Sequence, residues 1–506
     1  MTTLLHLLDR NHTWRDLIRL TFLYTAIFIP LLVLFDIPTQ HDDFLYSYQI
    51  NHLNQNLNEF YEYKRSIIPG LLLYKLYELI NLFKQSLATN TTWSVYLSIH
   101  FITGIATYFT VRKWLYLTSI KIKINVPFWV ASLMMFQQPA IESFANVSFG
   151  IRLISVLFIV LFLHVQLQQI EQPSTVKTVI ALGLTYLSIA FYEVNAFFLM
   201  IGFYLPLLVK GHFKRPGLNQ MKQYLIQCSI STLLPIVSIA PHMLTTLSGK
   251  STGASIEMAN QIKRFIYYCG QHVVPNIGGG ILAGSLLYSI AITVTMGLGF
   301  LMILKCSSLI KKRILLVLIH WLIFILILSF LPYFAPRLLI ASAFFFNLMI
   351  ILTLNYFYRV KPLGIGLILG TLLATSIINI LHFFVIQDEH HTTLNRIKTH
   401  IEYADSNNMC ANIYAATNRA PLIGLLPHKR IDLAYFFNYA LDTKQTCHNV
   451  VMEDTFWDLN TTHRMVETVT SKFWGAFFIH DPYRVTATYR PQLDTENKTK
   501  MTIINN

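Results

Sequence analysis

Long apolar runs separated by short polar segments dominate residues 1–386 of the chain. A helix needs about 20 predominantly apolar residues to cross the hydrocarbon core of a bilayer, and most of the runs approach that length. The pattern therefore predicts about eleven membrane-spanning helices. The runs lie at 17–35, 93–111, 126–141, 149–168, 178–192, 195–209, 224–245, 281–304, 314–331, 338–357 and 363–386.

Two segments admit a second interpretation. Residues 67–83 are apolar enough to be considered as a membrane span. Three polar residues within them recur with helical spacing, however, and this pattern predicts a helix lying in the membrane interface. Residues 178–209 are too short for two full spans, and they are interpreted as a short hairpin with Glu193 near its tip. A single long helix at 178–209 is the alternative, and it would invert the orientation of every later loop.

The composition supports a membrane protein. Hydrophobic residues make up 54% of the chain and charged residues 13%, whereas a soluble domain carries about 25% charged residues. A soluble enzyme, a secreted disulfide scaffold and a disordered protein are therefore excluded. The expected fold class is a polytopic α-helical membrane protein, formed by residues 1–386, with a small C-terminal α+β domain at 387–506. Turn-bounded apolar stretches at 432–441 and 472–480 favour a folded tail.

The formal net charge of +14 is unevenly distributed. Residues 387–506 are nearly neutral, so the basic excess belongs to the membrane region, where Lys and Arg gather in alternate loops. This asymmetry follows the positive-inside rule and predicts a cytoplasmic N-terminus and a tail on the outer side. The first run lacks a small-residue cleavage site and reads as an uncleaved signal anchor. A basic excess of this kind does not indicate a nucleic-acid partner.

Acidic residues of the membrane region gather at the outer face, above all in the first outer loop, 36–92. His41-Asp42-Asp43 follows directly on the first span, near the plane of the lipid headgroups. Adjacent carboxylates beside hydrocarbon repel each other and hold a proton more tightly, which suits a general base acting on a hydroxyl. The alternative is that Asp43 caps the helix that follows.

Four cations at the same face are candidates for binding a lipid phosphate: Lys64, Arg65, Arg152 and Arg337. An Arg at the depth of a span is costly unless it is paired or used, and a guanidinium suits a phosphate. Lys64 and Arg65 are equally compatible with a role as interfacial anchors, and the other two with packing. Aromatic and amide side chains of the first outer loop suit a carbohydrate surface, although an ordinary hydrated loop has a similar composition.

The five cysteines show no CxxC motif, no metal-binding spacing and no haem motif. Cys410 and Cys447 are the only cysteines of the tail. Because disulfides persist outside the cytoplasm, these two are predicted to form one. Two buried free thiols are the alternative, since spacing in sequence does not show whether two Cα atoms approach to bonding distance.

Several short motifs together resemble the GT-C class of membrane glycosyltransferases, which use lipid-linked sugars. They are Asp42-Asp43 in the first outer loop, Lys64-Arg65 later in that loop, Phe191-Tyr192-Glu193 in the hairpin and Pro336-Arg337 before a late span. Within that class, the chain is most similar to the phage-borne, serotype-converting O-antigen glucosyltransferases of enteric bacteria. The likeness covers the membrane region and does not extend to the tail.

The resemblance implies a reaction, its substrates and its location. The donor would be glucose on undecaprenyl phosphate, and the acceptor a hydroxyl of a lipid-linked O-antigen repeat unit of lipopolysaccharide, both at the periplasmic face of the inner membrane. Asp42 or Asp43 would take the acceptor proton in an inverting transfer, with His41 and Glu193 in supporting positions. The four cations would neutralise the leaving phosphate. This chemistry requires neither a metal nor another cofactor.

Other functions remain compatible with the sequence. A polysaccharide-lipid flippase or other transporter would place ionisable residues at mid-bilayer, and would show repeat symmetry between its halves. An O-antigen polymerase or an acyltransferase would share the membrane location and the lipid-linked substrate.

Overall fold

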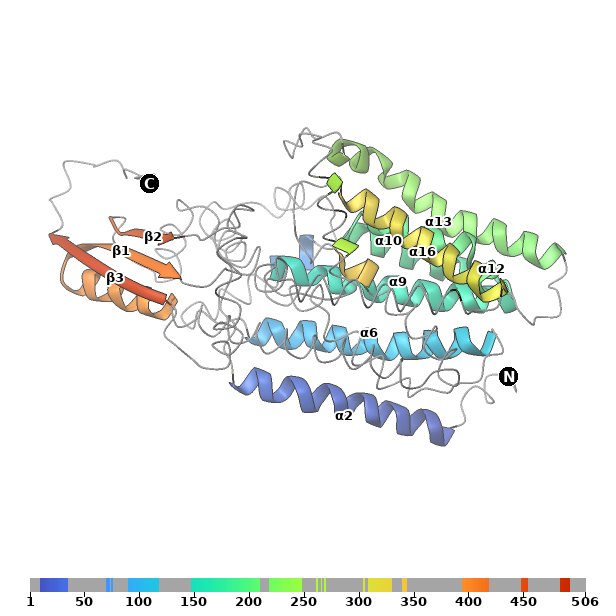
Figure 1. Ribbon diagram of the computed structural model, residues 1–506, viewed down its shortest axis with the longest axis horizontal. Helices are drawn as coiled ribbons and strands as arrows, with labels where there is room; N and C mark the ends of the chain where they lie inside the picture. Colours follow the sequence, from blue (N-terminus) through green and yellow to red (C-terminus); the bar gives the residue numbers. More distant parts are fainter. Residues whose placement is uncertain are drawn as a thin grey trace.

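The computed structural model is mostly helical, with a small three-stranded sheet in the tail (Figure 1). It describes residues 10–34, 70–72, 74–75, 90–117, 147–209, 218–247, 261–262, 265, 268–269, 304, 308–329, 339–343, 394–417, 447–453 and 483–491.

Five long helices overlap predicted apolar runs. They are α2 (Arg10–Leu34), α6 (Asn90–Leu117), α9 (Val147–Glu171), α13 (Leu218–Leu247) and α16 (Ser308–Ser329). The runs at 126–141, 281–304, 338–357 and 363–386 lie wholly or largely outside the described residues, so these spans stay predictions. The same holds for most of the interfacial helix expected at 67–83.

The hairpin expected at 178–209 is only partly correct. α10 (Thr175–Phe191) forms its first arm, and the chain leaves the helix at Tyr192 before α11 (Asn195–Leu199) begins. The expectation of one continuous apolar element at 195–209 is wrong. A 3₁₀ turn, η2 (Met200–Phe203), follows α11, and a further short helix, α12 (Leu205–Val209), follows the turn.

The change from α-helix to a 3₁₀ turn at Met200–Phe203 has a local chemical explanation. In a continuous helix the carbonyl of Gly202 would accept a hydrogen bond from the backbone N–H of residue 206, but Pro206 has no N–H. The hydroxyl of Tyr224, on α13, donates to the Gly202 carbonyl instead, at 2.7 Å. A Cβ added at Gly202 would lie 3.0 Å from Sγ of Cys228, so the glycine also lets α13 approach closely.

The long helices pack side by side around α9 (Figure 1). α6 and α10 both pack against α9, α13 packs against α10, and α2 contacts α6. A Cβ added at Gly150, near the start of α9, would overlap the ring of Tyr96 on α6. Glycine is therefore required where these two helices come closest.

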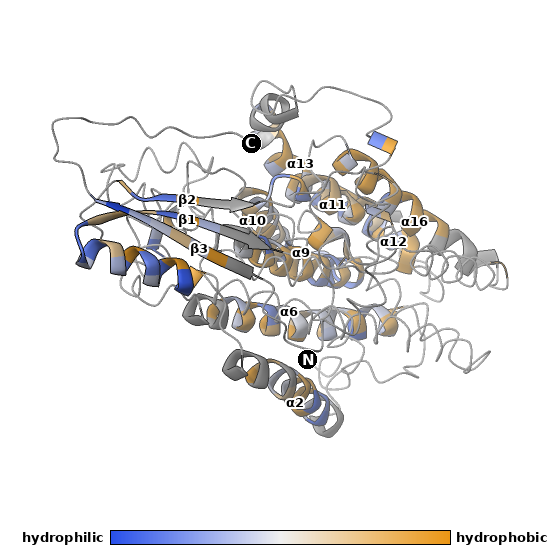
Figure 2. Cartoon of the chain, turned by 60° about the vertical axis from the view of Figure 1, so that its left-hand side comes forward, coloured by the Kyte–Doolittle hydropathy of each residue, from blue (hydrophilic) through white to orange (hydrophobic). Residues whose placement is uncertain are grey.

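Two helices of the bundle bury several polar side chains and expose large apolar ones, although most buried side chains of the bundle are apolar. α10 buries Thr178, Thr185 and Ser188, while Val176 and Val179 are 68% and 64% exposed. α13 repeats this arrangement, with buried Gln227, Ser231 and Thr232 and exposed Leu234 and Val237. Figure 2 shows that the bundle helices are largely hydrophobic, while the sheet and the helix beside it contain both hydrophilic and hydrophobic residues. Polar residues facing inward and apolar residues facing outward are typical of helices surrounded by lipid.

One stretch within the described residues, Arg152–Glu171 of α9, is long and apolar enough to cross a membrane. Two further apolar helices, Thr175–Phe191 and Leu315–Ser329, are shorter. The core helix of a soluble protein can have the same length and composition. The structure therefore shows a mostly helical protein with one candidate span and a small sheet, and the polytopic arrangement stays a prediction.

The described part of the tail combines one helix with a mixed sheet. Residues 394–406, here called the tail helix, lead into β1 (Met409–Thr417). β2 (Asn449–Glu453) pairs parallel with β1, and β3 (Tyr483–Pro491) pairs antiparallel on the other side of β1. The apolar stretches at 432–441 and 472–480 lie outside the described residues.

The tail helix is amphipathic, and it ends in a defined turn. Leu394, Ile397 and Ile401 are buried at helical spacing. Asn408 adopts a φ of 51°, a left-handed conformation that Asn takes up more readily than most residues, and this turn directs the chain into β1. The sheet lies beyond one end of the bundle, and the start of α2 lies at the other end (Figure 1).

Candidate functional site

The structure describes four of the residues for which the sequence predicts a role: Arg152, Glu193, Cys410 and Cys447. The others lie outside the described residues, so their roles stay predictions: His41, Asp42, Asp43, Lys64, Arg65 and Arg337. Arg152 and Glu193 therefore define the part of the predicted membrane site that the structure describes.

Arg152 and Tyr192 meet at one end of the bundle. Arg152 lies in the second turn of α9, and Tyr192 directly follows α10. The guanidinium carbon of Arg152 lies 5.2 Å from the centre of the Tyr192 ring. At this distance the negative face of an aromatic ring attracts a cation, and the attraction grows where water is excluded. Tyr192 is 7% exposed, so the ring side of this contact is shielded from water.

Hydrogen bonds hold the hairpin end in place. Asn195, at the start of α11, is fully buried, and its Nδ2 donates to the carbonyl and hydroxyl oxygens of Ser188 at 3.2 and 3.1 Å. The Ser188 hydroxyl donates to the carbonyl of Ser155 at 3.3 Å. The Ser155 hydroxyl donates to the carbonyl of Arg152 at 2.7 Å. These bonds link α11, α10 and α9 and position the backbone that carries Arg152.

Glu193 occupies the turn between α10 and α11, next to Tyr192. The turn is compact, because the backbone N–H of Ala196 donates to the Glu193 carbonyl at 3.1 Å and that of Asn195 to the Tyr192 carbonyl at 3.0 Å. A guanidinium can bind a phosphate through two parallel hydrogen bonds, and a carboxylate accepts hydrogen bonds from hydroxyl groups. Arg152 and Glu193 thus bring a cation and a carboxylate to the same end of the bundle.

A second cluster of charged residues joins α2 to α6. Arg112 donates to Oγ1 of Thr13 at 2.8 Å and to the hydroxyl oxygen of Tyr108 at 2.6 Å. The Tyr108 hydroxyl donates to Oδ2 of Asp16 at 2.6 Å. Because Thr13 and Asp16 lie near the start of α2, this cluster marks the end of the bundle at which α2 starts.

The same end holds a part-buried ion pair between Lys113 of α6 and Glu171, the last residue of α9, at 2.5 Å. Nε2 of Gln220, on α13, donates to the Glu171 carbonyl at 2.7 Å. Desolvation lowers the pKa of Lys177, at the start of α10; the negative charge of Glu171 opposes this shift, and the positive charge of Lys113 adds to it. Since α9 ends here, Arg152 at its start lies at the opposite end of the bundle.

The positive-inside pattern predicts that Arg112 and Lys113 lie in a loop after the span at 93–111. α6 instead continues to Leu117, beyond the expected end of its span at residue 111, so Arg112 and Lys113 lie within the helix. The spacing of Tyr108 and Arg112 was an available signal, because side chains four residues apart meet on a helix. The distant partner Glu171 leaves no such signal in a single sequence.

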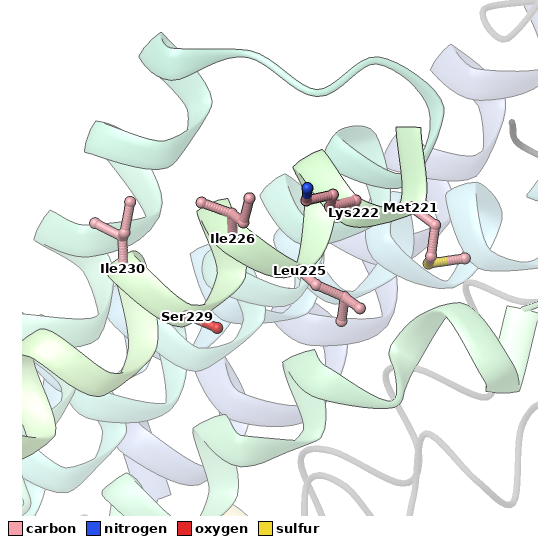
Figure 3. Close-up of a pocket in the computed structure, with 6 residues that line it drawn as sticks. All are labelled: Met221, Lys222, Leu225, Ile226, Ser229 and Ile230. Atoms are coloured by element: carbon pink, nitrogen blue, oxygen red, sulfur yellow. The ribbon is translucent and has the colours of Figure 1, made fainter. Parts of the chain in front are cut away.

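A groove of about 470 Å³ runs along α13. Its lining residues all come from that helix: Met221, Lys222, Leu225, Ile226, Ser229 and Ile230 (Figure 3). Apolar side chains dominate the lining, with one cation and one hydroxyl. The lining of this groove therefore offers one cation and no carboxylate.

The tail contains the predicted disulfide between Cys410 and Cys447, whose Cα atoms lie 5.4 Å apart. The alternative of two free thiols is therefore wrong. His448, directly after Cys447, is fully buried; its Nδ1 accepts the backbone N–H of Ala411 at 3.2 Å, and its Nε2 lies 2.9 Å from Oδ1 of Asp405. The disulfide and this histidine together tie β1, β2 and the tail helix into one unit.

Neither a metal site nor a relative guides the assignment further. Among the residues that the structure describes, no group of three or more His, Cys, Asp or Glu side chains is placed to hold a metal ion. No family model, curated protein or solved structure matches the chain significantly.

Proposed function

We propose that the chain is a membrane glycosyltransferase of the GT-C type. It takes glucose from undecaprenyl phosphate and transfers it to a lipid-linked O-antigen repeat unit at the periplasmic face of a bacterial inner membrane, which converts the serotype. The observation that carries the proposal is the contact of Arg152 with Tyr192. It joins the arginine nominated for phosphate binding to the Phe191-Tyr192-Glu193 motif, which carries part of the family resemblance.

The distribution of polar and apolar side chains supports insertion in a membrane. In water, the outward apolar residues of α10, α13 and α16 would forgo about 25 cal/mol for each Å² of apolar surface left unburied. In lipid this penalty disappears, while the inward Ser, Thr, Asn and Gln side chains hydrogen-bond between helices. The bonds from Gln166 to Ser231 at 3.2 Å and from Gln169 to Thr178 at 3.0 Å are of this kind.

The length of α9 supports a position of Arg152 and Glu171 at opposite faces of a membrane. The stretch Arg152–Glu171 contains 20 residues, which at 1.5 Å per residue corresponds to about 30 Å, the thickness of the hydrocarbon core. Arg152 and Glu171 would then lie at opposite interfaces. The sheet beyond one end of the bundle and the disulfide within the tail are both compatible with a periplasmic tail (Figure 1).

In the proposed reaction an acidic residue acts on the acceptor hydroxyl, and the cations act on the leaving phosphate. Asp42 or Asp43 removes the proton from the acceptor hydroxyl, whose oxygen bonds to the anomeric carbon of glucose as the bond from that carbon to the phosphate oxygen breaks. The configuration inverts, and undecaprenyl phosphate leaves with the bonding electrons. Arg152 and the other cations stabilise the phosphate as its charge grows. Tyr192 keeps the Arg152 guanidinium in position.

Transfer in vesicles tests the proposal. The purified chain is reconstituted with radiolabelled undecaprenyl-phosphate-glucose and lipid-linked O-antigen, and label in the acceptor is measured against protein-free vesicles. We expect transfer that requires both lipids and falls in Arg152→Ala, with partial retention in Arg152→Lys, because lysine keeps the charge without the bidentate fork. Folded wild-type protein that transfers no label above protein-free vesicles contradicts the proposal.

One observation favours transport as a second candidate. His320, on α16, packs between two rings inside the bundle, with its ring centre 5.7 Å from that of Phe198 and 5.2 Å from that of Tyr204. Ionisable side chains within spanning helices often mark a transport path. The same vesicles separate the two functions, because a flippase moves the lipid-linked sugar between leaflets and leaves the label on the donor.

A further inference from the structure

Three ring-bearing side chains gather on the surface of the tail. Tyr489 lies on β3, and His400 and Tyr403 lie on the tail helix. The Tyr403 and Tyr489 ring centres are 5.0 Å apart, with the ring planes inclined at 61°. The Tyr489 hydroxyl lies 2.7 Å from Nδ1 of His400, and the two share a hydrogen bond. We call these three residues the tail aromatic cluster.

The strand register explains why the cluster forms. Tyr489 is the cross-strand partner of Ala411, which is buried. Cross-strand partners point to the same face of a sheet, and Tyr489 meets the tail helix on that face. The cluster therefore follows the seam between the helix and β3. The rings remain accessible, with Tyr403 52% and Tyr489 37% exposed.

The cluster combines apolar ring faces with hydrogen-bonding groups and carries no charge when His400 is neutral. A neutral imidazole that accepts the Tyr489 hydroxyl at Nδ1 carries its proton on Nε2, where it can donate. The neighbouring Lys398 and Glu402 form an ion pair at 3.8 Å, so their charges offset each other beside the cluster. The surface is thus aromatic and rich in hydrogen-bonding groups, with the exposed Arg396 one helical turn before His400.

We infer that the tail aromatic cluster binds a neutral carbohydrate. The C–H groups of a sugar ring carry partial positive charge and pack on the negative face of an aromatic ring. Sugar hydroxyls match the phenol and imidazole groups. A protein partner of standard size would cover about 800 Å² on this side, more than three side chains provide.

This inference goes beyond the proposed transfer reaction, because it concerns binding by the tail and needs no donor lipid. If the proposed transfer reaction and this inference both hold, the tail aromatic cluster binds the saccharide acceptor while transfer takes place at the membrane. Binding and transfer are measured separately, so the failure of one does not imply the failure of the other.

The test uses the full chain in detergent on an array of lipid-free neutral bacterial O-polysaccharide fragments and dextran. Wild type binds at least one of these glycans. Tyr403→Ala and Tyr489→Ala each weaken this binding about tenfold, the loss expected when a tyrosine central to a contact is truncated. Tyr489→Phe, which keeps the ring and loses the bond to His400, weakens it less.

Tyr414→Ala is the matched control. Tyr414 is 42% exposed on the same sheet, but it is adjacent to the buried Ile413 on β1 and so points to the opposite face. Its loss leaves glycan binding unchanged. Retention of the Cys410–Cys447 disulfide, read on a non-reducing gel, shows that each variant still folds. A wild type that binds no glycan at millimolar concentration, or a Tyr414→Ala variant that loses as much affinity as Tyr403→Ala, overturns the inference.

Discussion

The guanidinium carbon of Arg152 lies 5.2 Å from the centre of the Tyr192 ring, where the start of α9 meets the end of α10. An arginine at the mouth of a span is costly unless its charge is compensated. The ring supplies part of that compensation through its negative face, which helps to orient the guanidinium.

Replacement of the ring should therefore weaken donor binding. Tyr192→Leu removes the attraction between cation and ring, and we expect donor affinity to fall by about 2-fold to 30-fold, which corresponds to about 0.5–2 kcal/mol. Tyr192→Phe keeps the ring face and should bind the donor nearly as well as wild type. Titration of labelled undecaprenyl-phosphate-glucose in vesicles measures both affinities. Equal losses in the two variants contradict a role for the ring.

A pair of glycine substitutions tests the packing of the bundle. Gly150→Ala places a Cβ against the Tyr96 ring, and overpacking of this kind costs about 1–3 kcal/mol of stability. Gly183→Ala is the control, because a Cβ there meets no atom within 4 Å and alanine favours the helix by about 0.5–1 kcal/mol. Thermal unfolding in detergent should rank Gly150→Ala below wild type and Gly183→Ala at or above it. The reverse order would show that α6 and α9 do not meet at Gly150.

The long helices among the described residues overlap runs predicted from the sequence, because an apolar run of helical length is visible in one chain. The disulfide follows from the expected compartment of two cysteines. Other features depend on contacts between distant residues. The break after Gly202 needs the Tyr224 hydroxyl as well as Pro206, and the contact of Arg152 with Tyr192 depends on how α9 and α10 align.

The ion pair of Lys113 with Glu171 should contribute more stability than an exposed pair. The Lys113 side chain is 9% exposed and the Glu171 side chain 26%. Removal of one partner from a fully buried pair costs about 3–5 kcal/mol, because it leaves the other charge unpaired, and the cost for this part-buried pair should be smaller. We expect Glu171→Gln to lower the unfolding temperature markedly. Arg19→Ala, which breaks the pair with Asp16, should change it little, because the Arg19 side chain is 61% exposed and exposed pairs contribute about 0–1 kcal/mol. Similar decreases of the unfolding temperature in Glu171→Gln and Arg19→Ala would contradict this expectation.

Thiol labelling tests the tail and its predicted side of the membrane. In intact cells a membrane-impermeant maleimide should label Cys410 and Cys447 only after reduction and mild denaturation, since the disulfide protects them. In the chain-entropy model the bond stabilises the tail by about 3–4 kcal/mol. Labelling without reductant would reject the disulfide, and no labelling even after reduction and denaturation would indicate a cytoplasmic tail.

Cys269 provides a pH control in the same experiment. Burial raises the pKa of its thiol to about 12, so the reactive thiolate is scarce at neutral pH and becomes more abundant as the pH rises towards the pKa. Its labelling in the folded protein should therefore be slow at pH 7 and accelerate with pH. Rapid labelling at pH 7 would show that the thiol is not buried.

The most direct test of the proposed glycosyltransferase is the rate of glucose transfer from undecaprenyl phosphate to lipid-linked O-antigen by purified wild type, Asp42→Asn and Asp43→Asn in vesicles. The amide cannot take the acceptor proton, so the substitution at the base should lower the rate by about 10²-fold to 10⁴-fold, with donor affinity retained. The other variant, at equal protein level, should remain active. Wild-type rates in both variants would contradict the assignment of the base, and folded wild-type protein without transfer would contradict the proposed function itself.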